Sequence, residues 1–278
     1  MRELLKFFVL TYIVSWTCFV GATHLKASST SQLAIVGGPL VLLGVFTPSL
    51  VALAVTALTD GRAGIRALLR QLVIMPSGIH WYVFAVGYIA VIKLAAALLH
   101  RFITGGWPAF GVENFLIMLM ATIISTPVQA GEEIGWRGYA LPRLANGLGL
   151  AKASIVLGLI WASWHLPFFF IPGNDTLGQS FPVYLLQVTA LSVAMAWLYW
   201  RTNGSLLLTM LMHAAVNNTK DIVPSTVPGA TDPFAFSASL VAWLTVSLLW
   251  ICAFYFLIRM RGKKLEISAS NETDFPAR

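Results

Sequence analysis

The apolar residues of this chain come in blocks of about 20, the length that a helix needs to cross a hydrocarbon core of ~30 Å. The chain has 278 residues, of which 58% are hydrophobic and 10% are charged. An average soluble domain carries roughly 25% charged residues, so this composition excludes an ordinary soluble protein. The sequence therefore predicts an all-α, polytopic membrane protein.

We predict eight transmembrane helices, because each apolar block is bounded by Pro, Gly or charged residues. The Pro residues within the second and fourth blocks predict kinks. The predicted spans are residues 4–23, 33–57, 79–99, 113–136, 151–172, 181–200, 204–220 and 236–258.

The predicted spans divide the chain into one transmembrane domain and a C-terminal tail. Residues 1–258 are predicted to form a single transmembrane domain, whose motif-bearing core covers about 113–220. Residues 259–278 are predicted to form a polar cytoplasmic tail. The stretch 60–74, "DGRAGIRALLRQLVI", carries basic and apolar residues at helical spacing. It could be a helix lying along the cytoplasmic surface or a solvated basic loop.

The basic residues predict the orientation in the cell membrane. With an even number of spans, both termini lie on one side, and the positive-inside rule makes that side cytoplasmic. The formal charge of +7 is then a topology signal, and nucleic-acid binding is not needed to explain it. That side collects Arg2, Lys6, Arg62, Arg66, Arg70, Arg137, Arg143, Lys152, Arg201, Arg259, Arg261, Lys263, Lys264 and Arg278, whereas the other side collects Lys26, Arg101 and Lys220.

Ionisable residues within the spans are few, and such residues usually mark function because a bilayer makes them costly. Lys93, in the third span, has a long side chain that can reach the interface, which favours a structural role. Glu132, His165 and His213 fall well inside three different spans. Each alone could satisfy a contact between helices by hydrogen bonding.

The depth of these three residues indicates that they could meet in one intramembrane cavity. At 1.5 Å per residue, Glu132 lies about 16 Å from Arg143 along its helix. On the same basis, His165 lies about 20 Å from Lys152, and His213 lies about 18 Å from Arg201. All three reference residues are predicted to be cytoplasmic. Similar depths on three helices favour a shared catalytic cavity over three separate contacts.

Spacing along the helices separates the two adjacent glutamates of "GEEIGWRGYALPRL" (131–144). Neighbouring helical positions point about 100° apart, so the two carboxylates cannot face one point. Glu133 and Arg137 are i and i+4 in the order that favours a helical ion pair, which assigns them structural support. Glu132 is then left to face the cavity.

The remaining polar residues suit peptide-bond hydrolysis. Glu132 could act as general base on a water also held by His165. His213 and Asn217 are i and i+4, so they share a helix face and could stabilise the oxyanion of a tetrahedral intermediate. Asn218 points elsewhere and is the weaker candidate. This chemistry needs no nucleophilic Ser or Cys, and a G-x-S-x-G elbow is absent from the sequence.

Three motifs in this order resemble those of the CPBP family, which includes the CAAX prenyl proteases of the Rce type and bacterial proteins related to bacteriocin self-immunity. They are "EEIGWR", "WASWH" and "HAAVN", within residues 132–217. The second motif of the family more often begins with Phe, where this chain has Trp161. The resemblance implies an eight-helix fold, endopeptidase activity, Glu132 with His165 as the water-activating pair, and His213 with Asn217 as the oxyanion site.

The resemblance leaves the cofactor and the exact function open. Family members are often named metalloproteases, and Glu132, His165 and His213 would be the zinc ligands if a metal is present. The H-E-x-x-H helix of ordinary zincins is absent, and we expect that no cofactor is required. The expected partners are the lipid bilayer and a membrane-associated peptide or protein substrate that could be prenylated.

Two alternative functions compete with a protease. One is a bacteriocin-immunity or peptide- or lipid-binding membrane protein that uses the same cavity without cutting. The other is a transporter whose buried acid and histidines carry protons, but the inverted repeats expected of a transporter are not visible in the sequence.

Overall fold

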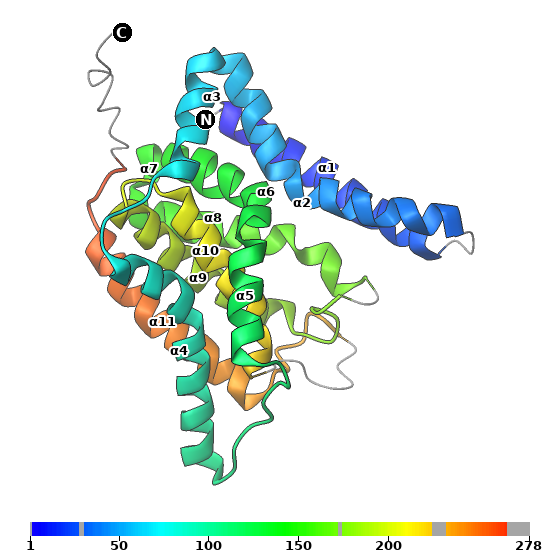
Figure 1. Cartoon of the computed structure of the whole chain (residues 1–278), viewed down its shortest axis with the longest axis vertical. Coiled ribbons are helices and arrows are strands. Elements are labelled where there is room, and N and C mark those ends of the chain that lie inside the picture. Colours follow the sequence, from blue (N-terminus) through cyan, green and yellow to red (C-terminus); the bar gives the residue numbers. More distant parts are fainter. Residues whose placement is uncertain (1, 28–30, 172–173, 224–231, 266–278) are drawn as a thin grey trace.

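The computed structural model of this chain describes residues 2–27, 31–171, 174–223 and 232–265. Within these ranges the regular structure is helical, without a strand, which confirms the predicted all-α class. Figure 1 shows a helical bundle from which α1 (Arg2–Ala27) and α2 (Ser31–Thr59) extend as a hairpin. The larger part of the predicted tail, residues 266–278, lies outside the described residues.

The bundle is formed by the helices that follow the hairpin. They are α3 (Gly61–Arg70), α4 (Ile79–Thr104), α5 (Phe115–Ser125), α6 (Ala130–Glu133), α7 (Leu141–Leu148), α8 (Leu150–Trp164), α9 (Phe181–Arg201), α10 (Leu206–Asn218) and α11 (Leu240–Met260). The α8 helix packs against α9, and α10 packs against α4 and α5.

Six described helical segments are long and apolar enough to cross a membrane, so the chain is a multi-pass membrane protein. The predicted count of eight is not confirmed, because α8 and α10 are apolar but shorter than the other six. At 1.5 Å per residue, a helix of 15 residues spans about 22 Å, less than a hydrocarbon core of ~30 Å. The α10 helix carries His213, and α8 ends at the residue before His165.

The fourth span differs most from its prediction. We predicted its end at residue 136, whereas the helical segment runs from Phe115 to Leu148. The charged residues near position 136 do not end the helix, because Glu133 and Arg137 pair inside the protein. An ion pair that is closed within the bundle removes the need for these charges to reach water.

Two irregular segments lie within that long helix. Pro127, where we predicted a kink, lies in a 3-10 segment at Thr126–Gln129. A π-helical segment follows at Ile134–Ala140, and such segments occur frequently at functional sites. By contrast, α2 continues as an α-helix through Pro39 and Pro48.

Close backbone contact fixes the π-helical segment against α2. A Cβ added at Gly135 would lie 2.6 Å from the carbonyl carbon and oxygen of Pro48, so this approach requires glycine. On the neighbouring turn, the Ser49 hydroxyl donates to the carbonyl of Ala130 at 2.5 Å. The α2 helix therefore sets the position of the segment that carries the two glutamates.

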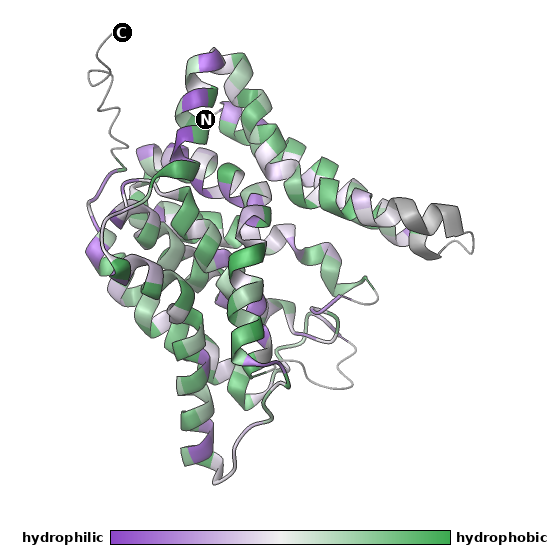
Figure 2. Cartoon of the chain, in the orientation of Figure 1, coloured by the Kyte–Doolittle hydropathy of each residue, from purple (hydrophilic) through white to green (hydrophobic). Residues whose placement is uncertain are grey.

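The surface of the bundle is apolar, as expected for contact with lipid. Figure 2 shows hydrophobic residues along most of the length of the helices. On α5, for example, the side chains of Leu116, Ile117 and Ile124 are exposed. Of the two alternatives for residues 60–74, the structure shows a helix, α3, which buries Leu68 and exposes its arginines.

Candidate active site

The predicted ion pair is present in the fully buried interior of the bundle. Arg137 Nη1 donates to Glu133 Oε1 at 2.7 Å, and neither side chain is exposed. The second guanidinium nitrogen, Nη2, lies 3.2 Å from the sulfur of Met195 on α9. The guanidinium carbon also lies 4.1 Å from the ring centroid of Trp161, in cation–π geometry. Arg137 therefore joins the glutamate helix to α8 and α9.

The same carboxylate of Glu133 also holds His213. The ring nitrogen Nδ1 of His213 lies 2.9 Å from Glu133 Oε1, and both side chains are buried. An ionised carboxylate can only accept hydrogen bonds, so Nδ1 of His213 is the donor. A neutral His213 consequently has no hydrogen on Nε2, and His213 can donate from Nε2 only in its protonated form.

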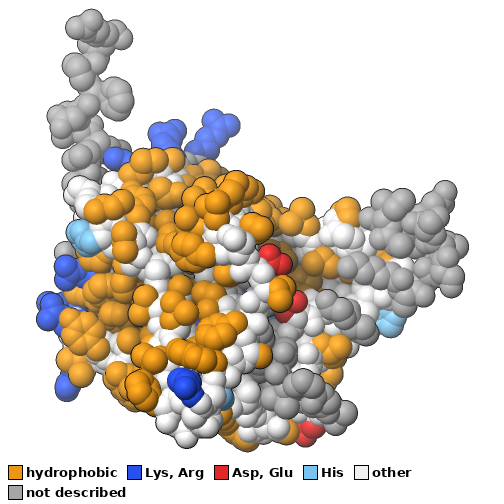
Figure 3. Space-filling model, turned by 60° about the horizontal axis from the view of Figure 1, so that its bottom comes forward, with side chains coloured by type: hydrophobic (Ala, Val, Ile, Leu, Met, Phe, Trp, Pro, Cys, Tyr) orange, Lys and Arg blue, Asp and Glu red, His pale blue; other side chains and the backbone are white. Residues whose placement is uncertain are grey.

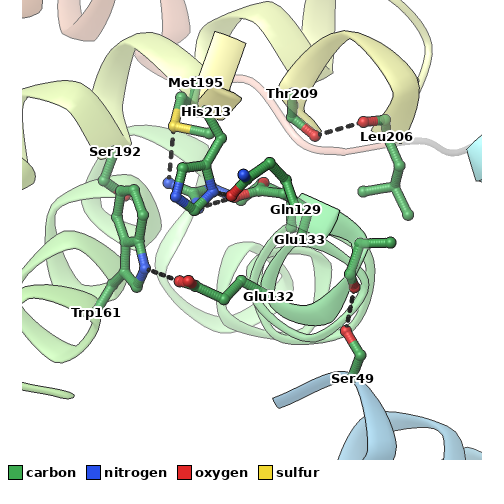
Figure 4. Close-up of polar contacts among 12 residues, drawn as sticks. Ser49, Gln129, Glu132, Glu133, Trp161, Ser192, Met195, Leu206, Thr209 and His213 are labelled. Carbon is green, nitrogen blue, oxygen red and sulfur yellow. Dashed lines mark hydrogen bonds and ion pairs between the residues drawn. The ribbon is translucent and has the colours of Figure 1, made fainter. Parts of the chain in front are cut away.

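Glu132 faces a different neighbour. The indole nitrogen Nε1 of Trp161 donates to Glu132 Oε2 at 2.7 Å, and Glu132 is 6% exposed. Figure 4 shows Glu132 directed toward Trp161, and Glu133 joined to His213. As predicted from the helical spacing, the two adjacent carboxylates therefore have different partners.

His165 directly follows the last residue of α8 and has its orientation fixed by the backbone. Its Nδ1 lies 2.8 Å from the carbonyl oxygen of Trp161, one turn earlier. A carbonyl oxygen accepts, so Nδ1 carries the hydrogen and Nε2 is an acceptor in the neutral ring. The side chain of Trp161 also bonds to Glu132, so one residue contacts both predicted members of the water-activating pair.

A cavity of about 710 Å³ gathers most of the predicted site. Its lining includes His165, His213 and Asn217, together with Trp161 and Tyr184. Glu132 does not contribute to the described lining but contacts it through its bond with Trp161. The structure thus brings side chains from α8, α9 and α10 to one cavity, with the glutamate helix directly behind Trp161.

The two asparagines at the end of α10 have different surroundings. Asn217 is exposed toward the cavity, and its Nδ2 lies 3.4 Å from the side-chain oxygen of Gln129. Asn218, the weaker candidate, instead donates to the Ser125 hydroxyl at 2.9 Å and to the Ala214 carbonyl at 2.8 Å. Asn218 therefore joins α10 to α5, away from the cavity lining.

The described residues do not form a metal centre in this conformation. No group of three or more His, Cys, Asp or Glu side chains within the described ranges could hold a metal ion. Each histidine has a Nδ1 partner of the kind that often orients a metal ligand. Glu132, the third member of the predicted zinc set, accepts a hydrogen bond from Trp161 at Oε2. The present arrangement of these side chains therefore does not fit the zinc site that the name metalloprotease, used for family members, implies.

Several contributions to the site were not predicted from the sequence. The indole hydrogen bond to Glu132 and the contacts of Gln129 and Met195 depend on how the helices approach one another. Lys93, predicted to be structural, lines the cavity, and its Nζ donates to the backbone oxygens of Lys220 at 2.6 Å and Val223 at 3.2 Å. The motif spacing contained no signal for these contacts.

Comparisons with known proteins agree with the motifs. Residues 111–219 match the family model described as type II CAAX prenyl endopeptidase Rce1-like. This segment is similar to an Rce1-like CAAX prenyl endopeptidase. The comparison confirms the resemblance to the CPBP family for the part of the chain that contains all three motifs.

A curated relative matches the chain over a similar length. The protein named CAAX prenyl protease 2 from Methanococcus maripaludis is 29% identical over 118 residues. That alignment covers 40% of this chain and 41% of the relative, so each protein has a larger part outside the match. The similarity to this relative is therefore limited to less than half of either protein.

Proposed function

We propose that this chain is an intramembrane endopeptidase that hydrolyses a peptide bond with a water activated by Glu132 and His165. The observation that carries the proposal is the single cavity lined by His165, His213 and Asn217, with Glu132 bonded to its wall. The Rce1-like match over residues 111–219 supports the same reaction class.

The hydrogen bonds suggest how the proposed base would work. A carboxylate has about four sites that accept hydrogen bonds, and Trp161 occupies one of those on Oε2 of Glu132. Oε1 would then accept a proton from the attacking water, while Nε2 of His165 would accept a hydrogen bond from the hydrogen that stays on the water oxygen. The water oxygen would attack the substrate carbonyl, and Glu132 would pass its proton to the amine that leaves.

The proposed oxyanion site requires His213 to be protonated. Its Nε2 can donate to an oxyanion only when the ring is protonated, because Nδ1 already donates to Glu133. Glu133 would hold the protonated ring through Nδ1, as a carboxylate orients the histidine of a catalytic triad, while also pairing with Arg137. Glu133 is thus proposed as a positioning residue, and the Asn217 amide as the second donor.

We propose that the reaction requires no metal, because no group of three or more His, Cys, Asp or Glu side chains among the described residues could hold a metal ion. Activity should survive exhaustive chelation, and elemental analysis should find no stoichiometric zinc in the purified active protein. Restoration of a chelated, inactive sample by added Zn²⁺ would contradict this proposal, and would make Glu132, His165 and His213 the ligands to test.

We propose a membrane-associated peptide or protein as the substrate, with prenylated proteins, which the relative's name indicates, as one class to test. The direct experiment compares peptides released from membranes that contain the wild-type chain or Glu132→Gln. Peptides that appear with wild type alone would support proteolysis. Equal peptide maps, together with saturable binding of a peptide by both forms, would favour a binding or immunity protein instead.

A further inference from the structure

One end of the molecule is joined by contacts among segments that are distant in the sequence. Arg143 donates to Asp60 at 3.2 Å, and the Leu150 amide donates to the Lys263 carbonyl at 3.2 Å. The start of α1 lies here as well, since the ring of Phe7 is 4.9 Å from that of Tyr139. We call this the basic end, formed by residues 2–7, 59–70, 139–152, 200–204 and 259–265.

The opposite end is joined by a second set of contacts. Lys220 pairs with Asp175, and the Gly111 amide donates to the Ile222 carbonyl at 3.4 Å. The Phe181 amide donates to the Pro233 carbonyl at 2.7 Å. We call this the distal end, formed by residues 101–114, 174–181, 219–223 and 232–239. The basic end lies toward the top of Figure 1 and the distal end toward the bottom.

Charge is distributed very unequally between the two ends. The described residues of the basic end include Arg2, Lys6, Arg62, Arg66, Arg70, Arg143, Lys152, Arg201, Arg259, Arg261, Lys263 and Lys264. The described distal end has Arg101 and Lys220. Figure 3, which brings the bottom of the Figure 1 view forward, shows basic side chains mainly along the edges of a largely hydrophobic face.

The structure corrects one member of the predicted cytoplasmic set. Arg137 is fully buried in its pair with Glu133 and belongs to neither end. The asymmetry remains large without it. By the positive-inside rule, the basic end lies in the cytoplasm and the distal end faces the opposite side of the membrane.

The cavity extends to the distal end. Its lining includes Asn174, Asp175, Thr176, Leu177 and Gln179 from the segment before α9, as well as Lys220 after α10. No residue of the basic end contributes to the described lining. The Asp175–Lys220 pair joins two of the distal segments at this mouth, and both of its side chains are substantially exposed.

We infer that the cavity receives its ligand from the non-cytoplasmic side of the membrane. If the proposed function holds, on which this identification of the ligand rests, the substrate is an exported peptide or a membrane-protein segment exposed on that side. A protein confined to the cytoplasm, prenylated or not, would meet the basic end and not the mouth of the cavity, so its cleavage in intact cells would count against this inference.

Thiol labelling of intact cells tests the orientation without measuring activity. In a background with Cys18→Ala and Cys252→Ala, Leu177→Cys places a thiol at the mouth, where Leu177 is exposed. Asn146→Cys is the matched control, since Asn146 is exposed on α7 at the basic end. A membrane-impermeant maleimide should label position 177 in intact cells and position 146 only after permeabilisation. The reverse pattern would overturn the inference.

A second measurement separates this inference from the proposed function. Reporter peptides are added to sealed membrane vesicles of both orientations that carry wild type or Glu132→Gln. We expect cleavage by wild type when the distal end faces outward, with at least a ~10²-fold lower rate for the variant. External labelling at position 177 without any cleavage would support the orientation and contradict the protease. Cleavage only in vesicles with the basic end outward would overturn the inference.

Discussion

Glu132 and Glu133 point to two sides of one helix, and their buried carboxylates are stabilised by different kinds of partner. On one side, Glu133 binds both Arg137 and His213 and is fully buried. On the other side, Glu132 receives one hydrogen bond from the described part of the chain, from Trp161, beside the cavity. A carboxylate with several cationic or polar partners stabilises the fold, whereas one with a single neutral partner retains the capacity to bind water.

The cost of burial explains why both arrangements occur next to each other. A lone charge in a low-dielectric interior is unfavourable by several kcal/mol, so the Glu133–Arg137 pair must be closed within the protein. Once it is closed, the π-helical segment that contains Arg137 is held between α2, α8 and α9. Glu132 is thereby positioned without having to contribute an ion pair of its own.

The largest effect is expected on the side of Glu133. Glu133→Gln leaves the Arg137 cation buried without its anionic partner, and breaking such a pair costs about 3–5 kcal/mol. Thermal unfolding in detergent should show a strongly destabilised protein. Glu3→Gln is the matched control, because it breaks the exposed Glu3–Lys6 pair, with N–O distance 2.9 Å, and should leave the melting temperature unchanged.

Removing both charges sharpens this part of the comparison. Glu133→Gln combined with Arg137→Met removes both charges of the fully buried pair, and it places a flexible apolar side chain beside Met195. We expect the double variant to regain part of the stability lost by Glu133→Gln alone. A double variant that melts below both single variants would show that the pair stabilises the fold by more than mutual neutralisation.

The next largest effect should separate stability from activity. Glu132→Gln preserves the size of the side chain and an oxygen that can accept from Trp161, but it removes the base. We expect a folded, monodisperse protein whose rate of peptide cleavage falls at least ~10²-fold. An early-melting Glu132→Gln together with a stable but inactive Glu133→Gln would reverse the roles of the two glutamates.

The different partners of Glu132 and Glu133 could be predicted only in part from the sequence. Helical spacing was sufficient to predict the pair of Glu133 with Arg137, because both residues belong to one segment and lie about one turn apart. Apolar block length predicted the helices, although α8 and α10 are too short to be counted as spans. The motif order predicted the Rce1-like resemblance, which the match over residues 111–219 confirms.

Contacts between segments could not be predicted in this way. The bond from Trp161 to Glu132 joins residues 29 positions apart, and the bond from His213 to Glu133 joins residues 80 positions apart. Neither bond has a periodicity or a spacing that a single sequence reveals. The cavity depends as well on the segment before α9, which carries no recognised motif. The roles of Glu132, His165, His213 and Asn217 stay predictions.

The smallest effect is expected from the single hydrogen bond that distinguishes Glu132. Trp161→Phe keeps an aromatic ring near Arg137 but removes the indole donor, and a lost hydrogen bond to a charged group costs about 1.5–3 kcal/mol at most. Water can replace part of that bond beside a cavity, so we expect roughly a 10-fold lower cleavage rate, equivalent to about 1.4 kcal/mol, and little change in melting temperature.

Trp164→Phe is the matched control for this variant. Trp164 lies three residues away and is fully buried, and its Nε1 has no hydrogen-bond partner among the described residues. Its substitution removes an indole donor without breaking a hydrogen bond. If both substitutions lower the cleavage rate equally, the effect comes from ring volume and not from the bond to Glu132. A drop confined to Trp161→Phe would show that the indole donor holds Glu132 in the position required of the base.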